Sequence, residues 1–334
     1  MSASVGSLRT VLFDCDGVLW NGDAVVAGVP AALQALRRGG PQGRRDVLFI
    51  TNNSMKTRAQ AAAKFEALGF AGVAAADIIT SGSSAARYLT EVARLPGSAR
   101  PRALVVGTPA LVAELSAAGI EVVEPPAGVA AGAITADVFR AMEPDASVGA
   151  VVVGADPCFA YAKLAHAALA LQDPGCLFVA TNRDAADNVG GAARPRLLPG
   201  GGSIVAAIAK ASGREPVNCG KGGDWMVEML RMEFGIGGGA RHGEEAGGGG
   251  GAGGAAAVGM VGDRMDTDVA FGRQCGFTTF LPLTGVTTPP MLAEAAAAFR
   301  MAYAEGASTG EALAGGPSLP HFVIEDVTWL QSEE

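Results

Sequence analysis

Short apolar runs recur along the whole chain, and small or polar residues follow each of them. The runs lie at residues 11–13, 47–50, 103–106, 150–153, 176–179, 258–261 and 278–281. Continuous apolarity over a few residues is typical of strands that are buried on both faces, as in a parallel sheet. The pattern therefore predicts a buried parallel strand at each of these places.

Between these runs the apolar residues take a helical spacing. One helical face is formed at positions i, i+3, i+4 and i+7 by Val29, Ala32, Leu33 and Leu36. Thr57 and Gln60 have the spacing of a capping box, and the helix that they begin is expected to end at Gly69. Alternating strands and helices predict an α/β protein with a doubly wound, mostly parallel sheet.

The length of 334 residues suggests about two domains. Turn residues at Pro96-Gly97 and at Gly213 indicate the boundaries of an inserted second domain. The segment 235–257 has 12 glycines among its 23 residues and little apolar content. We interpret it as a flexible surface loop between a predicted helix at 225–234 and the strand at 258–261.

Composition excludes several classes of function. The net charge of −8 argues against nonspecific nucleic-acid binding, which needs a basic face. Three histidines disfavour a zinc site with several of them, and five cysteines without a Cys-x-x-Cys pair indicate a reduced compartment. The uncharged stretch 246–262 is mostly Gly and Ala, so no membrane span is predicted.

The N-terminal segment bears on localisation. Ten residues precede the first apolar run, which is too short for a signal or transit peptide. We therefore expect a cytoplasmic protein, with a chloroplast location as the alternative if a transit peptide has been removed.

The run at 11–13 is followed by two aspartates and a glycine: Asp14, Asp16 and Gly17. Functional sites of open α/β sheets lie at the carboxyl ends of the strands, so this pair is a candidate catalytic centre. The structural alternative is an ordinary Asp-x-Asp-Gly turn, in which the side chains bond to their own backbone.

Three further groups of residues likewise have both a functional and a structural interpretation. Thr51 and Asn52 follow a strand and suit a phosphate cradle, or a plain polar loop. Lys221 lies among glycines before a helix, where it can hold a phosphate or remain solvated. Asp263 and Asp268 flank a strand-to-helix turn and suit a cation such as Mg²⁺, or simple helix capping.

In their order and spacing the four groups resemble the motifs of the haloacid dehalogenase (HAD) superfamily of phosphohydrolases. The motifs are Asp-x-Asp-Gly-Val, Thr-Asn-Asn, Gly-Lys and Gly-Asp-Arg-x-x-Thr-Asp, and the resemblance covers nearly the whole chain. The segment between the second and third motifs looks like the C2-type cap of that superfamily. The resemblance thus implies a Rossmann-like core at 1–100 and 214–334, interrupted by an α/β C2 cap at 101–213.

Within the superfamily the chain is similar to the 4-nitrophenylphosphatase group, which contains phosphoglycolate phosphatases and pyridoxal phosphate phosphatases. The similar segments are 149–154, 161–164, 176–184 and 200–203. The segments 176–185 and 200–203 look most like photorespiratory phosphoglycolate phosphatases. The third motif departs from the usual Gly-Lys-Pro, because Gly222 follows Lys221. We expect this change to hold Lys221 more loosely and to lower the activity.

The resemblance implies a mechanism. Asp14 would be the nucleophile and form an aspartyl-phosphate, and Asp16 would be the general acid and base. The phosphate oxygens would be held by Thr51, Asn52 and Lys221. The ligands of the Mg²⁺ cofactor would be Asp14, Asp16, Asp263 and Asp268.

The expected substrate is a small phosphomonoester, with 2-phosphoglycolate the first choice. Alternatives are pyridoxal 5′-phosphate, a nucleotide monophosphate or a phosphoprotein, and an inactive binding protein of the same fold is a further one. Cap residues would select the substrate, and Arg183 and Asp184 are the candidates. The resemblance also allows a homodimer formed through the cap.

Overall fold

The computed structural model describes residues 8–39, 45–123, 135–140, 142–188, 196–234, 258–304 and 318–332. The predicted glycine-rich loop 235–257 lies outside the described residues. None of the described helices is both long enough and apolar enough to cross a membrane.

The first sheet has six parallel strands in the order β15-β14-β13-β1-β4-β5. Its strands are β1 (Thr10–Phe13), β4 (Asp46–Thr51), β5 (Ile78–Thr80), β13 (Val258–Val261), β14 (Thr278–Pro282) and β15 (Phe322–Ile324). β1 pairs with β13 on one side and with β4 on the other. The motifs that follow these three strands therefore meet at one edge of the sheet.

The second sheet has five parallel strands in the order β12-β9-β8-β6-β7. Its strands are β6 (Arg102–Val106), β7 (Glu121–Val123), β8 (Val148–Val153), β9 (Leu177–Ala180) and β12 (Val217–Asn218). The segment 101–213 holds the first four of these, whereas β12 follows Gly213 and still pairs with β9. The sheet thus extends past the expected end of the cap, and the domain boundaries remain a prediction.

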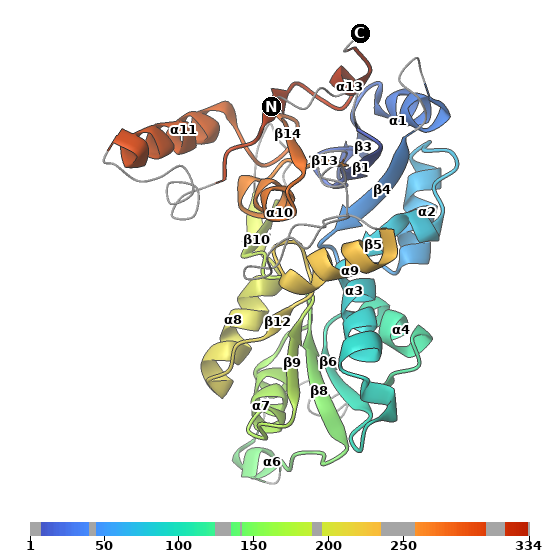
Figure 1. The fold of residues 1–334 in the computed structure, drawn as a ribbon. Coiled ribbons are helices and arrows are strands. Elements are labelled where there is room, and N and C mark those ends of the chain that lie inside the picture. Colours follow the sequence, from blue (N-terminus) through green and yellow to red (C-terminus); the bar gives the residue numbers. More distant parts are fainter. Residues whose placement is uncertain are drawn as a thin grey trace, which may run out of the picture.

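Helices cover the sheets and connect their strands (Figure 1). They are α1 (Val29–Arg38), α2 (Arg58–Ala67), α3 (Ser81–Arg87), α4 (Pro109–Ala117), α6 (Ala136–Arg140), α7 (Tyr161–Ala170), α8 (Gly201–Ser212), α9 (Asp224–Phe234), α10 (Ala270–Gln274), α11 (Pro289–Ala304) and α13 (Trp329–Ser332). Single helical turns lie at Ala75–Asp77, Tyr88–Val92, Leu95–Gly97 and Met265–Val269.

Local sequence signals form as predicted in α1 and α2. The four apolar residues of α1 are buried. In α2 the Thr57 hydroxyl accepts the backbone N–H of Gln60, and the Gln60 side chain accepts the N–H of Thr57. Two antiparallel hairpins complete the fold: β2 (Trp20–Asn21) with β3 (Ala24–Val25), and β10 (Ala186–Asn188) with β11 (Leu197–Pro199).

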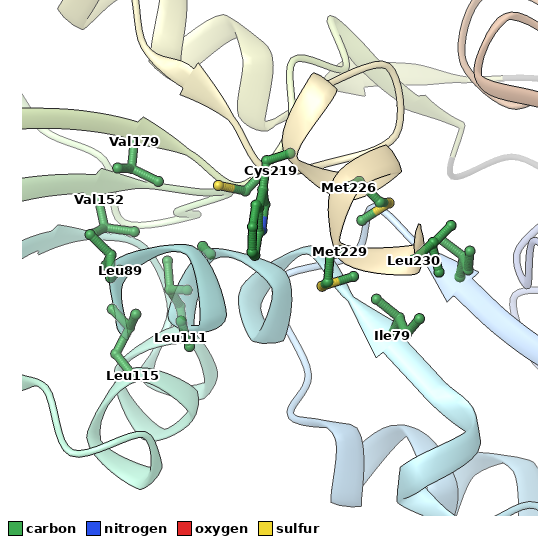
Figure 2. Close-up of a cluster of buried hydrophobic side chains, with 14 of the residues drawn as sticks. Ile79, Leu89, Leu111, Leu115, Val152, Val179, Cys219, Met226, Met229 and Leu230 are labelled. Atoms are coloured by element: carbon green, nitrogen blue, oxygen red, sulfur yellow. The ribbon is translucent and has the colours of Figure 1, made fainter. Parts of the chain in front are cut away.

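One apolar cluster joins the two sheets. α3 and α9 lie at the level between the upper and lower sheets (Figure 1). In the close-up view, three side chains of α9 point toward Ile79 of the first sheet: Met226, Met229 and Leu230 (Figure 2). The same cluster continues to Val152 of the second sheet. Because this surface is buried on both sides, it favours one arrangement of the sheets.

The carboxyl ends of the two sheets face one another. The side chain of Asn182, just after β9, donates from Nδ2 to the carbonyl of Asn52, just after β4, at 2.7 Å. The predicted α/β class with parallel sheets is thereby confirmed, and any site at the strand ends lies between a core sheet and a second sheet.

Candidate active site

Three carboxylates gather at the carboxyl edge of the first sheet. Asp14 follows β1 and Asp263 follows β13, so the parallel pairing of these strands makes the two residues neighbours. Asp268 lies in the helical turn after Asp263. One carboxylate oxygen from each residue lies within 4.8 Å of the others, and all three side chains are buried.

Lys221 lies against this cluster. Its Nζ is 2.8 Å from Asp14 Oδ1 and 2.6 Å from Asp268 Oδ1, and the residue is 4% exposed. Burial alone would lower the pKa of Lys221, but the charges of Asp14 and Asp268 raise it above its ordinary value. The two ion pairs hold the ammonium firmly. Gly222 has φ +84°, which proline cannot adopt, so the usual Gly-Lys-Pro does not fit this turn.

The charges of this cluster do not balance. Burial raises the pKa of Asp14, and burial followed by the charge of Asp268 raises the pKa of Asp263 to about 7. Three buried carboxylates face one ammonium, so two negative charges lack compensation when all are ionised. A hard dication such as Mg²⁺ fits both that deficit and an all-oxygen donor set.

Gly17 completes the close packing around Asp263. It has φ +85°, and a Cβ at this position would overlap the Asp263 carboxylate. Only glycine therefore permits the Asp14–Gly17 turn to lie against Asp263.

Asp16 lies apart from the buried cluster. Its side chain is 55% exposed. Oδ1 accepts the indole N–H of Trp20 at 2.8 Å, and Lys64 Nζ lies 3.7 Å from the same oxygen. The predicted role of Asp16 in binding the metal remains a prediction, since its carboxylate is not one of the three clustered groups.

Thr51 and Asn52 end β4 beside Lys221. The Thr51 hydroxyl accepts the backbone N–H of Asn53 at 3.1 Å. The Asn52 Oδ1 accepts the backbone N–H of Lys221 at 2.8 Å, and its Nδ2 donates to Asp184. The side chain of Asn52 thus positions Lys221 and Asp184, which sequence reasoning did not foresee.

A cavity of about 980 Å³ opens above these residues. Its core side includes Asp14, Asp16, Thr51, Asn52, Lys221 and Asp263, and its other wall includes Asp156, Phe159, Asn182, Asp184 and Ile204. Among the described lining residues the cations are Lys221 and Arg264. All of the predicted catalytic, phosphate-binding and metal-binding residues except Asp268 line this one cavity.

The structure separates the two candidate specificity residues. Asp184 lines the cavity. Arg183 is not among the described lining residues; its Nη2 lies 2.6 Å from Glu215 on the surface, and its side chain is 53% exposed. The expectation that Arg183 meets the substrate therefore has no support from its position.

Sequence reasoning missed Arg264 as a site residue, although it lies inside the fourth motif. Its guanidinium pairs with Asp266 at 2.7 Å and donates to the carbonyl of Ala186, at the start of β10, at 3.1 Å. A side chain that follows the first sheet thereby contacts the β10–β11 hairpin. The motif itself could have drawn attention to Arg264, but nothing in it indicates Ala186.

Family models match both ends of the chain. A haloacid dehalogenase-like hydrolase model matches residues 11–121, and a HAD-hydrolase-like model matches residues 218–330. Together they contain all four motifs described above.

Characterised relatives cover most of the chain. It is 41% identical over 295 residues to human glycerol-3-phosphate phosphatase (86% of this chain, 82% of the relative). It is 38% identical over 284 residues to mouse chronophin (85% and 84%) and 38% over 283 residues to phosphoglycolate phosphatase 2 of Arabidopsis thaliana (84% and 85%).

Solved structures share the fold. A glycerol phosphate phosphatase from Mycobacterium tuberculosis in complex with magnesium superposes with a TM-score of 0.67 at 28% identity, over 99% of this chain and 79% of that one. A 4-nitrophenylphosphatase from Thermotoga maritima superposes with a TM-score of 0.69 at 23% identity, over 99% of both chains. With motifs, cavity and relatives in agreement, the chain belongs to the haloacid dehalogenase-like hydrolases and is a phosphatase, a hydrolase of phosphoric monoesters.

Proposed function

We propose that this phosphatase is Mg²⁺-dependent and hydrolyses 2-phosphoglycolate through an aspartyl-phosphate on Asp14. The observation that carries the proposal is the position of Asp14 in the cavity, with its Oδ1 2.8 Å from Lys221 Nζ. The lysine holds the carboxylate in place and offers positive charge to an approaching phosphate.

The chemistry consists of two displacements at phosphorus. The Asp14 carboxylate forms a bond to phosphorus while the bond to the substrate alcohol breaks, and Asp16 donates a proton to the departing oxygen. Asp16 then accepts a proton from water, whose oxygen attacks phosphorus and releases Asp14 and inorganic phosphate. Thr51, Lys221 and the backbone of Asn52 hold the phosphate oxygens in both steps.

The metal would be held by the Asp14 and Asp263 carboxylates and the Asp16 carbonyl, with Asp268 supporting them. Bound there, Mg²⁺ would offset the repulsion between the Asp14 carboxylate and the phosphate dianion. Asp268 has both oxygens engaged, one by Lys221 and one by the backbone N–H of Arg264.

The presence of Arg264 in the cavity favours a substrate with a second anionic group besides the phosphate. Its side chain is 19% exposed and lines the cavity, where its guanidinium is paired with Asp266 and donates to the carbonyl of Ala186, much as Lys221 is paired with two carboxylates. A guanidinium suits a carboxylate such as that of glycolate. The relationship to Arabidopsis phosphoglycolate phosphatase is consistent with this choice.

Glycerol phosphate is the second candidate. Asp184 places a carboxylate on the wall opposite the phosphate site, where it would accept hydrogen bonds from hydroxyl groups and repel a carboxylate, whereas Asp156 is neutralised by its ion pair with Lys163. The human relative at 41% identity has the name glycerol-3-phosphate phosphatase.

The test is phosphate release with and without Mg²⁺ from 2-phosphoglycolate, glycerol 3-phosphate, pyridoxal 5′-phosphate, a nucleotide monophosphate and a phosphopeptide. We expect 2-phosphoglycolate to have the largest kcat/KM of these substrates. The Asp14→Asn variant should release no phosphate from any of them. Full activity of Asp14→Asn would refute the nucleophile, and a preference for glycerol 3-phosphate would select the second candidate.

We also propose a homodimer formed through the cap, as the family resemblance implies. In the β10–β11 hairpin, Leu197 is 65% exposed and would be covered by a partner. Sedimentation velocity of wild type and Leu197→Lys tests it: a monomeric wild type would contradict the proposal.

A further inference from the structure

The side chain of Asp16 is contacted by two residues that lie outside all four motifs. Trp20 donates its indole N–H to Asp16 Oδ1 at 2.8 Å, and Lys64 Nζ is 3.7 Å from the same oxygen. The Lys64 ammonium also lies over the Trp20 ring, 4.4 Å from its centroid. Each of the three side chains therefore touches the other two.

We propose that Trp20 and Lys64 are positioning residues for Asp16. Both contacts use Oδ1, so they fix the carboxyl group and leave Oδ2 to meet the oxygen of the departing alcohol. This inference rests on the proposed function, in which Asp16 is the acid of the first displacement.

Trp20 is itself held rigidly. It is 3% exposed, and its ring packs edge-on against Phe65 and Phe70 with centroids 4.8 and 5.6 Å away. Its carbonyl accepts the backbone N–H of Gly17 at 2.7 Å, which closes the turn after Asp16. The indole nitrogen therefore has a fixed place from which to hold Asp16.

Lys64 approaches from a different element. It lies on α2, and its side chain is 17% exposed. The ring of Trp20 and the carboxylate of Asp16 both attract its ammonium. Two elements thus converge on one oxygen of a side chain that is otherwise 55% exposed.

Such support matters because a half-exposed carboxyl group otherwise samples several rotamers. A general acid must lie within hydrogen-bond reach of the oxygen that it protonates. Fixing the Asp16 rotamer in advance reduces the conformational entropy that the side chain loses when it reaches that geometry.

Leaving groups that differ in basicity provide the test. An alkoxide needs a proton as it departs, whereas p-nitrophenolate is a stable anion that does not. The kinetic constant kcat/KM covers the steps up to departure of the leaving group, provided that this step is irreversible. Trp20→Phe removes the N–H and keeps an aromatic ring, and Lys64→Met keeps an apolar stem of similar length.

We expect Trp20→Phe to lower kcat/KM for 2-phosphoglycolate by about 10-fold, the effect of one hydrogen bond to a charged group. Lys64→Met should lower it by about 3-fold, since the pair is partly exposed. Both variants should change kcat/KM for p-nitrophenyl phosphate by less than about 2-fold, because a change in the acid alone leaves that substrate unaffected.

Lys56→Met is the matched control for charge. Lys56 is exposed and borders a small cavity that Asp16, Trp20 and Lys64 also line. Among the described residues, however, the ion pair to Asp16 comes from Lys64. It should leave both substrates unchanged. Thermal unfolding of each variant shows whether the fold is intact.

Asp16→Asn shows whether a negative result contradicts the proposed acid or only the proposed positioning role. If it lowers kcat/KM equally for both substrates, Asp16 is not the acid and the proposed function is wrong at this residue. If it discriminates between the substrates but Trp20→Phe and Lys64→Met lower both equally, the acid is correct and the positioning role is wrong.

Discussion

The Nδ2 of Asn52 lies 3.0 and 3.2 Å from the two carboxylate oxygens of Asp184, so one amide group joins the core to the second sheet. The other end of that amide accepts the backbone N–H of Lys221 at 2.8 Å. A single side chain after β4 therefore sets both the closure of the cavity and the place of the phosphate-binding lysine.

This relationship predicts the effect of removing Asp184. Asp184→Ala deletes a hydrogen-bond acceptor that is charged, a loss of about 1.5–3 kcal/mol. We expect kcat/KM for the best substrate to fall by about 10- to 100-fold. The matched control is Arg183→Ala, whose exposed pair with Glu215 should matter little. An equal loss in Arg183→Ala would restore Arg183 as a specificity residue.

Lys221→Met should lower kcat far more than Asp184→Ala lowers kcat/KM. The substitution removes the only ammonium of the buried cluster among the described residues and a preorganised partner of the phosphate. Loss of one such contact lowers kcat by about 10²- to 10³-fold. Saturating steady-state kinetics measures it, with circular dichroism to confirm folding. A variant within 3-fold (about 0.7 kcal/mol in activation free energy) of wild type would exclude a role for Lys221 in the transition state.

Gly17→Ala should weaken the metal site selectively. Its Cβ would displace the Asp263 carboxylate, so the Mg²⁺ concentration for half-maximal activity should rise by about 10-fold or more, the size of effect seen when groups that orient metal ligands are changed. Gly69→Ala is the control, because Gly69 has nearly the same φ, +84°, with open space around it. That control should lose stability and keep its Mg²⁺ requirement. Equal requirements in both variants would contradict the steric argument.

The apolar pattern identified the middle of each sheet and missed its edges. Every predicted run became a strand, among them β1, β4 and β13. The four further strands of the two sheets, β5, β7, β12 and β15, are the outer ones. They have two or three residues each. Edge strands bury less surface, so they do not need the long apolar runs by which central strands are recognised.

The same contrast holds at the site. The meeting of Asp14 with Asp263 follows from parallel strands that end at one edge, which sequence order and the strand prediction suffice to indicate. The contact of Asn52 with Asp184 joins residues 132 positions apart, in loops that follow strands of two different sheets. Nothing local encodes it. Likewise, whether Arg183 or its neighbour faces the cavity depends on side-chain direction in a loop, which has no periodicity to fix it.

The pKa of Asp263 predicts how the metal-free protein responds to pH. In the folded protein this pKa is raised from 3.8 to about 7, chiefly by burial and then by Asp268. An acid with a raised pKa destabilises the fold when it ionises. The penalty is therefore absent below pH 4, grows between pH 4 and 7 and is complete above pH 7, where it reaches up to about 4 kcal/mol.

Asp263→Asn removes that penalty and keeps an oxygen that can accept the backbone N–H of Val286, as the carboxylate does. In EDTA the variant should be more stable than wild type at pH 8 and equal to it near pH 4, by chemical denaturation. A difference that is constant with pH would show that Asp263 does not titrate in this range. With Mg²⁺ at 100 times its Kd at pH 8, the stability advantage of the variant should shrink by about 2.7 kcal/mol, because binding stabilises only a protein that retains the site.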